Sequence, residues 1–383
     1  MSVTTPRGFR AAGVVAGLKA SGRPDVALVV NDGPDHHAAA VFTSNRVEAA
    51  PVTWSRTVVA DGRADAVVLN SGGANACTGA PGFQDTHATA EHVGGLLDVA
   101  PGDVVVCSTG LIGERLPMER LLGGIDAAAG SLAPDGGPAA AEAIMTTDTV
   151  AKTAHAERDG WSVGGMAKGA GMLAPALATM LVVVTTDAVL DPADLDPALR
   201  AATRTTFDRI DSDGCMSTND TVVLLASGAS GVEVGADELT EALTAVCADL
   251  ARQLVADAEG AHHDIAVEVR GAATEDDALE VARSVARNNL FKCAVFGGDP
   301  NWGRVLAAVG TTAAAFDPAG LDVSMNGVQV CRSGGVGEDR TLVDLSAREV
   351  RVVVDLHAGD AAVTVWTNDL THDYVHENSA YST

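Results

Sequence analysis

The feature that most constrains the fold is the alternation of short β-branched runs with longer stretches rich in alanine and leucine. The β-branched runs are 26–30, 67–69, 104–106, 181–184, 222–225, 265–269, 352–356 and 363–366. The stretches with helical spacing include 86–99, 119–129, 239–256 and 275–288. Strands that alternate with helices over 383 residues predict a layered α/β architecture with more than one sheet. The length is typical of two to three domains.

The charge balance excludes several classes of partner. The chain carries 51 acidic and 25 basic residues, which gives a formal net charge of -26. A field of this sign repels phosphate backbones and anionic membrane surfaces. Aromatic residues make up only 3% of the chain, too few to build platforms for stacked bases. We therefore expect small-molecule substrates, with no nucleic-acid or membrane partner.

The six cysteines are widely dispersed, and even the nearest pair, Cys77 and Cys107, forms no CxxC motif. This spacing excludes the thiol-rich zinc and iron–sulfur patterns, so we predict no metal. Unpaired cysteines in a chain of this length are typical of reduced thiols in a cytosol. The N-terminus lacks the apolar region of a signal peptide, and no apolar run approaches the roughly 18 residues of a membrane helix. These features predict a soluble, cytoplasmic protein.

A glycine-rich loop that leads to Thr179 carries the strongest chemical signal. Residues 169–174 match the letters of a dinucleotide fingerprint, but Pro175 interrupts the helix that this fingerprint requires. A threonine at the start of a strand is commonly structural. Attack of the Thr179 hydroxyl on the Ala178 carbonyl would instead form an ester, whose hydrolysis frees an α-amine. Such an amine has a pKa of about 7.7–8.0, which suits a general base.

Further motifs occur in order along the chain. They are Asn70–Gly79, Ser108–Gly113, Met145–Thr149, Met216–Thr221, Asp299–Arg304 and the C-terminal Asp369–Thr383. Together with the loop 168–180, they resemble the ornithine acetyltransferase family, the bifunctional glutamate N-acetyltransferases of arginine biosynthesis. The resemblance extends over essentially the whole chain.

The resemblance implies a precursor that cleaves itself between Ala178 and Thr179. Cleavage would give an α chain of residues 1–178 and a β chain of residues 179–383 in an α2β2 heterotetramer. The implied fold is a layered α/β sandwich of mixed sheets and helices, of the N-terminal threonine nucleophile type and built from both chains.

The resemblance also implies a ping-pong acetyl transfer without a resident cofactor. Thr179 would take the acetyl group of N2-acetylornithine and pass it to glutamate, with its own α-amine as base. Thr109 and Gly110 match the oxyanion-hole pair of the family. Losing one such donor typically lowers the rate about 10²–10³-fold. Whether acetyl-CoA also serves as an acetyl donor is left open.

Six positions match substrate-binding residues of the family: Thr146, Lys168, Thr179, Glu259, Asn378 and Thr383. We hypothesise that Lys168 pairs with the α-carboxylate that both substrates carry, because it is the only charged residue between Asp159 and Asp187. Glu259 is suited to hold the δ-ammonium of ornithine. Each of these residue types also has an ordinary structural role, such as a surface charge for lysine or glutamate and a turn hydroxyl for threonine.

One segment departs from the family pattern, because His262 and His263 stand where many members have Thr-Lys. The change removes a lysine charge close to the expected site. Neighbouring residues of a strand point to opposite faces, so we interpret this pair as exposed polar residues and not as zinc ligands. His372 and His376 are interpreted in the same way. The motif Asp299–Arg304 is interpreted as a structural turn close to the site.

Two other functional classes stay open on sequence grounds. An N-terminal nucleophile amidohydrolase or aminopeptidase would use the same threonine and amine, with water in place of glutamate. An unprocessed, non-catalytic binding protein is the third possibility, although Thr109, Lys168 and Thr179 occurring together disfavours it.

Overall fold

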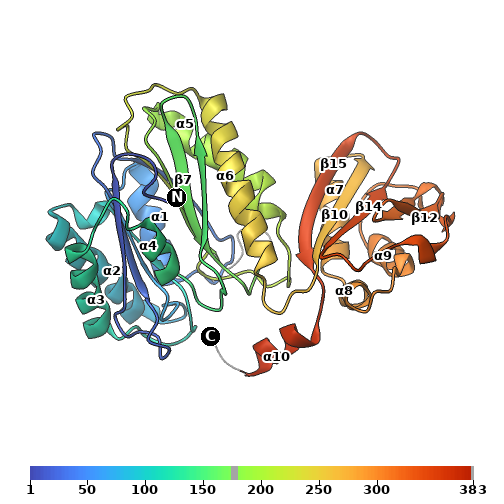
Figure 1. Ribbon diagram of the computed structural model, residues 1–383, viewed down its shortest axis with the longest axis horizontal. Helices are drawn as coiled ribbons and strands as arrows, with labels where there is room; N and C mark the ends of the chain where they lie inside the picture. The colour runs from blue at the N-terminus through green and yellow to red at the C-terminus, as the bar shows by residue number, and fades with distance from the viewer. Residues whose placement is uncertain (174–179, 381–383) are drawn as a thin grey trace. The chain divides into compact units, whose positions relative to one another are not determined.

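A computed structural model describes residues 1–173 and 180–380, which form two compact units. Unit 1 comprises Met1–Asp208 and Cys215–Asp257, and unit 2 comprises Arg209–Gly214 and the chain from Ala258 onward. Both units combine sheets and helices (Figure 1), which confirms the predicted mixed α/β class. Within the described residues, no helix is long and apolar enough to cross a membrane.

Unit 1 contains a four-stranded sheet in the order β1-β2-β4-β5. Its strands are β1 (Phe9–Val14), β2 (Val26–Asn31), β4 (Ala66–Asn70) and β5 (Val104–Ser108). One face packs against α2 (Gly79–Leu97) and α3 (Met118–Gly130), while α1 (Ala50–Val58) packs on β5. Because β4 and β5 are parallel and in register from Ala66 and Val104, both end at the same edge of the sheet.

The second sheet of unit 1 has five strands in the order β3-β9-β8-β7-β6. They are β3 (His37–Phe42), β9 (Thr221–Ala226), β8 (Leu181–Thr186), β7 (Ser162–Lys168) and β6 (Lys152–Glu157). The helices α5 (Pro192–Thr205) and α6 (Ala236–Ala256) cover its outer face. The chain boundary predicted at 178/179 lies between β7 and β8, which pair antiparallel, and so falls inside unit 1.

The inner faces of the two sheets share one hydrophobic core, so unit 1 has four layers in the order helices, sheet, sheet, helices. Strands buried on both faces have continuous apolar sequences, as β2 and β8 do. The shared core includes Val29, Val67, Val105, Met166, Val183 and Val223. The helix α4 (Gly137–Ala143) contributes alanines to the same core.

Unit 2 contains a six-stranded sheet in the order β13-β12-β11-β14-β10-β15. Its strands are β10 (Asp264–Ala272), β11 (Asp322–Met325), β12 (Val328–Arg332), β13 (Gly335–Val336), β14 (Glu349–Asp355) and β15 (Ala361–Asn368). The helices α7 (Glu275–Ala286), α8 (Asn289–Phe296) and α9 (Trp302–Val309) share a core with the sheet, and α10 (His372–Ala380) follows β15. Burial alternates along β10 and β14, as expected for a sheet covered on one face.

Short 3-10 helices complete the two units. They are η1 (Val59–Asp61), η2 (Pro101–Asp103), η3 (Phe207–Arg209), η4 (Pro318–Gly320) and η5 (Arg340–Leu342).

Candidate functional site

The predicted oxyanion turn and the predicted carboxylate-binding lysine lie together in unit 1. Thr109 directly follows β5, and Lys168 is the last residue of β7. The Lys168 ammonium lies 3.3 Å from the Thr109 hydroxyl oxygen, although the two residues are far apart in the sequence. The ends of one strand from each sheet therefore meet at this point.

The turn at Thr109 and Gly110 is fixed by backbone contacts. The Thr109 amide donates to the Asn70 carbonyl at 2.9 Å, which fixes the turn against the end of β4. Gly110 has a φ of 130°, and a Cβ at this position would lie 2.7 Å from the Gly73 nitrogen. Only glycine fits there. The Gly110 N–H donates to no acceptor within the described part of the chain, which leaves it available to a developing oxyanion.

Lys168 is not a surface lysine, because its side chain is only 1% exposed. A buried ammonium requires compensation by acceptors or negative charge. The Thr109 hydroxyl is one partner, and the buried Asp148 carboxylate acts on Lys168 electrostatically. A lysine held this way presents a desolvated positive charge, which suits the recognition of a carboxylate.

Asp148 holds two of the predicted substrate-binding segments, a role that the sequence did not indicate. Its Oδ2 accepts the Thr146 amide hydrogen at 2.9 Å, and its Oδ1 accepts the Gly169 amide hydrogen at 2.7 Å. Burial favours a higher pKa for Asp148, but the charges of Lys168 and Lys152 outweigh it and hold this pKa at about 2. Asp148 is therefore ionised and fixes the backbone at Thr146 and beside Lys168.

A buried lysine extends this arrangement to the end of α6. Lys152 is fully buried, and its ammonium lies 2.7 Å from Asp148 Oδ1 and 2.6 Å from Asp257 Oδ2. Asp257 also accepts the Thr149 amide hydrogen at 3.0 Å. Removing one partner of such a buried ion pair is costly, because the other charge is left uncompensated. The loop that carries Thr146 is consequently fixed on both sides by charge-assisted hydrogen bonds.

Replacing Asp148 by asparagine is expected to lower stability at neutral pH and to make stability less dependent on pH in acid. The depressed pKa of Asp148 stabilises the fold above the ordinary aspartate pKa of about 3.9, and this contribution is lost as the pH falls towards 2. Asp148→Asn should lower the free energy of unfolding at pH 7 by about 2 kcal/mol and flatten its decline between pH 4 and 2. Urea unfolding at these pH values measures both effects. The control Asp159→Asn, at an exposed position, should change neither the free energy of unfolding at pH 7 nor its decline in acid. If wild type and Asp148→Asn had the same free energy of unfolding at every pH, the depressed pKa assigned to Asp148 would be contradicted.

Asn219 joins the oxyanion turn to the second sheet. Its side-chain amide donates to the Ser108 carbonyl at 2.8 Å and to the Ala74 carbonyl at 2.6 Å. Ser108 immediately precedes Thr109, and Asn219 lies just before β9. The motif 216–221 was recognised in the sequence, but nothing in its residue types indicated which carbonyls it would bind.

Three predicted positions, Ala178, Thr179 and Thr383, lie outside the described residues. The predicted nucleophile precedes Met180, which is described. The Met180 amide donates to Asp220 Oδ1 at 3.0 Å, and the Met180 carbonyl accepts from the Thr221 amide at 3.2 Å. The chain that leaves the predicted cleavage point therefore enters β8 in a fixed register with β9.

In unit 2, the predicted substrate contacts Glu259 and Asn378 lie together. The Asn378 side-chain amide donates to Glu259 Oε2 at 3.0 Å. A pocket is lined by Glu259 and by polar and charged residues that include Asp213, Lys292 and Tyr374. Asn378 belongs to α10, whose start is tied to the segment after Glu259 by the Thr371 hydroxyl, which donates to the Gly260 carbonyl at 2.6 Å.

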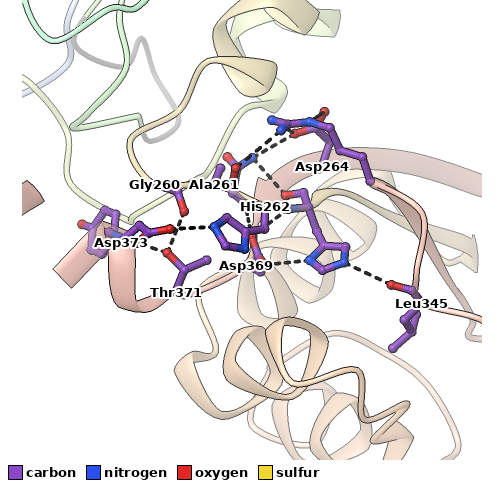
Figure 2. A network of polar contacts seen from close by, with 12 residues as sticks. Gly260, Ala261, His262, Asp264, Leu345, Asp369, Thr371 and Asp373 are labelled. Atoms are coloured by element: carbon purple, nitrogen blue, oxygen red, sulfur yellow. Dashed lines mark hydrogen bonds and ion pairs between the residues drawn. The ribbon is translucent and has the colours of Figure 1, made fainter. Parts of the chain in front are cut away.

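His263, which stands where many family members have lysine, lies between two hydrogen-bonding partners. Its Nε2 lies 3.1 Å from the Leu345 carbonyl oxygen and its Nδ1 lies 2.7 Å from Asp369 Oδ2. A carbonyl oxygen only accepts, and Asp369 Oδ1 already accepts two amide hydrogens, from His262 and His263. His263 and its neighbours thus form a polar network centred on Asp369. Figure 2 shows this network around Asp369.

The interpretation of the two histidines as exposed polar residues holds only in part. His262 is exposed and pairs with Asp373 at 2.7 Å, whereas the His263 side chain is only 14% exposed. His372 is exposed on α10 and packs edge-on against Phe296. No cluster of three potential metal ligands occurs among the described residues.

The motif Asp299–Arg304 forms the start of α9. The Asn301 side chain accepts from the Arg304 amide at 3.3 Å, and its amide donates to Asp299 Oδ2 at 2.9 Å. The motif is thus a helix cap, which agrees with the predicted structural turn.

Comparison with known proteins identifies the family. The model of the ArgJ family matches residues 10–383. The chain belongs to the ArgJ family. This ArgJ family member is 67% identical over 382 residues to the arginine biosynthesis bifunctional protein ArgJ of Streptomyces coelicolor, with 100% of both chains covered. It is 66% identical over 383 residues to the protein of the same name from Thermobifida fusca, again with 100% of both chains covered. The resemblance inferred from the motifs is confirmed.

Two solved structures are similar to this ArgJ family chain. Ornithine acetyltransferase from Mycobacterium tuberculosis, complexed with ornithine, is 56% identical, and the match covers 47% of this chain and 96% of that chain with a TM-score of 0.45. The arginine biosynthesis bifunctional protein ArgJ of Bacillus halodurans is 37% identical, with 52% and 98% covered and a TM-score of 0.50.

Proposed function

We propose that this ArgJ family enzyme transfers the acetyl group of N2-acetylornithine to glutamate through an acetyl-Thr179 intermediate, giving ornithine and N-acetylglutamate. The observation that carries the proposal is the buried Lys168 ammonium beside the Thr109 hydroxyl, at the end of the strand that leads towards residue 179. The Lys168 ammonium, which could bind a carboxylate, is therefore close to the Thr109–Gly110 turn, which is proposed to bind the oxyanion. The full-length relatives named as bifunctional proteins of arginine biosynthesis support the same activity.

The chain is proposed to cleave itself between Ala178 and Thr179 into α and β chains, which assemble as α2β2 in the cytoplasm. The solved ArgJ protein of Bacillus halodurans supports cleavage, because it matches only 52% of this chain while 98% of its own length is covered. A cut at this point would leave β7 and β8 paired within one sheet, so the two chains would stay joined by their shared core.

The proposed chemistry balances with the residues available. The Thr179 hydroxyl loses its proton to its own α-amine as its oxygen bonds to the acetyl carbonyl carbon. Thr109 and Gly110 would stabilise the oxyanion of the tetrahedral intermediate. The carbon–nitrogen bond of acetylornithine then breaks, and the proton passes to the departing α-amine of ornithine. Glutamate reverses these steps with its own α-amine and receives the acetyl group.

Lys168 and Thr146 would take the α-carboxylate end that both substrates share, and Glu259 with Asn378 would take the side chain of ornithine. Thr383 is proposed as a further C-terminal contact. No resident cofactor takes part in these steps, and acetyl-CoA is proposed as a second acetyl donor to Thr179.

Two measurements on the purified wild-type chain test this function. Intact mass under denaturing conditions should give two fragments that meet between Ala178 and Thr179. Ornithine release from N2-acetylornithine should then depend on glutamate and be accompanied by equal N-acetylglutamate. Release that is unchanged by glutamate would favour the amidohydrolase, and a chain without any acetyl transfer would favour the binding protein.

A further inference from the structure

A closed circuit of hydrogen bonds in unit 2 joins the segment at Glu259 to α10. The Thr371 hydroxyl donates to the Gly260 carbonyl at 2.6 Å, as Figure 2 shows, and accepts the Tyr374 amide hydrogen at 2.9 Å. The Asn378 side-chain nitrogen donates one hydrogen to the Tyr374 carbonyl and the other to Glu259 Oε2, each at 3.0 Å. Because Glu259 and Gly260 are neighbours in the chain, the circuit closes on itself.

Thr371 connects the two segments through a single buried hydroxyl. The residue is 2% exposed and immediately precedes α10, so its contact with the Tyr374 amide is the N-terminal cap of this helix. Its carbonyl also accepts the Val375 amide hydrogen at 3.5 Å. Gly260 has a φ of 61°, and a Cβ there would lie 2.2 Å from the Tyr374 nitrogen, so only glycine permits this approach. The hydroxyl therefore determines how closely the start of α10 lies against Gly260.

The circuit also determines which atoms of Asn378 remain for a ligand. Both hydrogens of its side-chain nitrogen are used, by Tyr374 and by Glu259. Within the described residues its side-chain oxygen accepts no hydrogen bond, and the residue is exposed. The Asn378 oxygen and the Glu259 carboxylate are both acceptors. Such a pair suits an ammonium group, whereas a second carboxylate would be repelled.

We propose that Thr371 is a positioning residue that sets the specificity for the acetyl donor: its hydroxyl holds Glu259 and Asn378 together as an acceptor pair for the side-chain ammonium of N2-acetylornithine. This inference rests on the proposed function. It adds that glutamate, which carries a carboxylate in place of the ammonium, does not use this pair. The hydroxyl of Thr371 should therefore matter in one half-reaction and not in the other.

Other contacts should keep both segments folded when this hydroxyl is removed. Asp369 Oδ1 accepts the amide hydrogens of His262 and His263 at 2.9 and 2.8 Å. The strands β10 and β15, which adjoin the two segments, also pair with each other. Loss of the Thr371 hydroxyl should consequently loosen the acceptor pair without unfolding unit 2.

The test compares Thr371→Val with Thr371→Ser in acetyl transfer from N2-acetylornithine to glutamate. Valine keeps the shape of threonine and removes both hydrogen bonds of the hydroxyl, whereas serine keeps the hydroxyl. In a ping-pong reaction, the kcat/KM of each substrate reports only its own half-reaction. For Thr371→Val we expect kcat/KM for N2-acetylornithine to fall about 10–100-fold, as for the loss of one charge-assisted hydrogen bond, and kcat/KM for glutamate to change less than about threefold. Thr371→Ser should restore most of the lost kcat/KM for N2-acetylornithine.

N2-acetylnorvaline is the matched substrate, because its side chain has the same carbon atoms as that of ornithine but lacks the amine. Wild type should prefer N2-acetylornithine, and Thr371→Val should reduce this preference about 10–100-fold by slowing only the substrate that carries the ammonium. Hydrogen exchange gives a readout without turnover. The amides of the peptide that contains Tyr374 should exchange at least about fivefold faster in Thr371→Val than in wild type or in Thr371→Ser.

The remaining outcomes contradict the inference. Equal losses for N2-acetylornithine and glutamate, or for N2-acetylornithine and N2-acetylnorvaline, would make Thr371 a purely structural residue. Unchanged kinetics and exchange in Thr371→Val, or no rescue by Thr371→Ser, would show that the hydroxyl does not position the pair. If Thr371→Val fails to fold, Gly260→Ala should separate α10 from the other side and give the same split between substrates; failure of both to fold would also leave a purely structural role. A wild-type chain that transfers no acetyl group would instead overturn the proposed function.

Discussion

A Thr179→Ala chain is expected to remain a single polypeptide of 38.7 kDa without detectable acetyl transfer. The substitution removes the hydroxyl that is proposed to attack the Ala178 carbonyl, so neither the ester nor the free α-amine would form. Removing a catalytic nucleophile typically lowers kcat by about 10⁶-fold, which is below the detection limit of most transfer assays. Intact mass and glutamate-dependent ornithine release measure the two losses separately.

Thr179→Ser is the matched control, because serine keeps the hydroxyl and loses only a methyl group. This variant should still be cut at the same bond and should retain measurable transfer. Two fragments from the Thr179→Ala chain would contradict the proposal, since cleavage would then not depend on this hydroxyl. A cut Thr179→Ala chain that also transfers acetyl groups would remove residue 179 from the mechanism altogether.

Thr109→Val is expected to lower kcat by about 10²–10³-fold with KM nearly unchanged. Valine matches threonine in shape, so the turn against Asn70 should persist, but the hydroxyl donor is lost. A donor that acts on the oxyanion stabilises the transition state more than the ground state, which is why kcat carries the effect. Steady-state kinetics with both substrates, measured on protein of confirmed chain composition, provide the test.

Thr109→Ser provides the control for the hydroxyl itself. It should keep kcat within a few-fold of wild type, because the donor is retained beside Lys168. If Thr109→Val instead raised KM and left kcat unchanged, Thr109 would act in substrate binding through Lys168. A variant as active as wild type would exclude the hydroxyl from the oxyanion hole.

Much of the fold was accessible from local sequence pattern. The β-branched runs correspond to β2, β4, β5, β8, β9, β10, β14 and β15, with only end residues differing. The four helical stretches overlap α2, α3, α6 and α7, but 86–99 and 275–288 extend past the ends of α2 and α7. Strands that are buried on both faces need apolar, branched side chains, so runs of such residues in the sequence predict these strands. The motifs likewise marked the family, which the comparisons confirm.

Several of the strands that were missed, among them β1, β3 and β7, are rich in small residues. β7 contains Gly164 and Gly165, and a Cβ at Gly164 would lie 2.2 Å from the Ser2 carbonyl oxygen, while one at Gly165 would lie 3.0 Å from Leu250. Small residues are required where another segment packs closely on the strand, and that requirement comes from a distant part of the chain. Strand propensity alone therefore underestimates β7.

The division into units was equally beyond the sequence pattern. The segment Arg209–Gly214 belongs to unit 2 although both neighbours along the chain belong to unit 1. Asp211 pairs with Arg287 at 2.7 Å, and its amide donates to the Trp366 carbonyl at 2.8 Å. Such pairings join residues that are far apart in sequence, and no local periodicity encodes them.

The sequence by itself determined part of the strands and helices, the family, and the candidate residues Thr109, Lys168 and Thr179, because hydrophobic runs and motifs are local properties. The tertiary structure decided which charges are buried and what they pair with. It placed Asp148 against the backbone at Thr146 and Asp220 against the amide of Met180. The energy of a buried charge depends on its partners and on the exclusion of water, and both are fixed only when distant segments pack together.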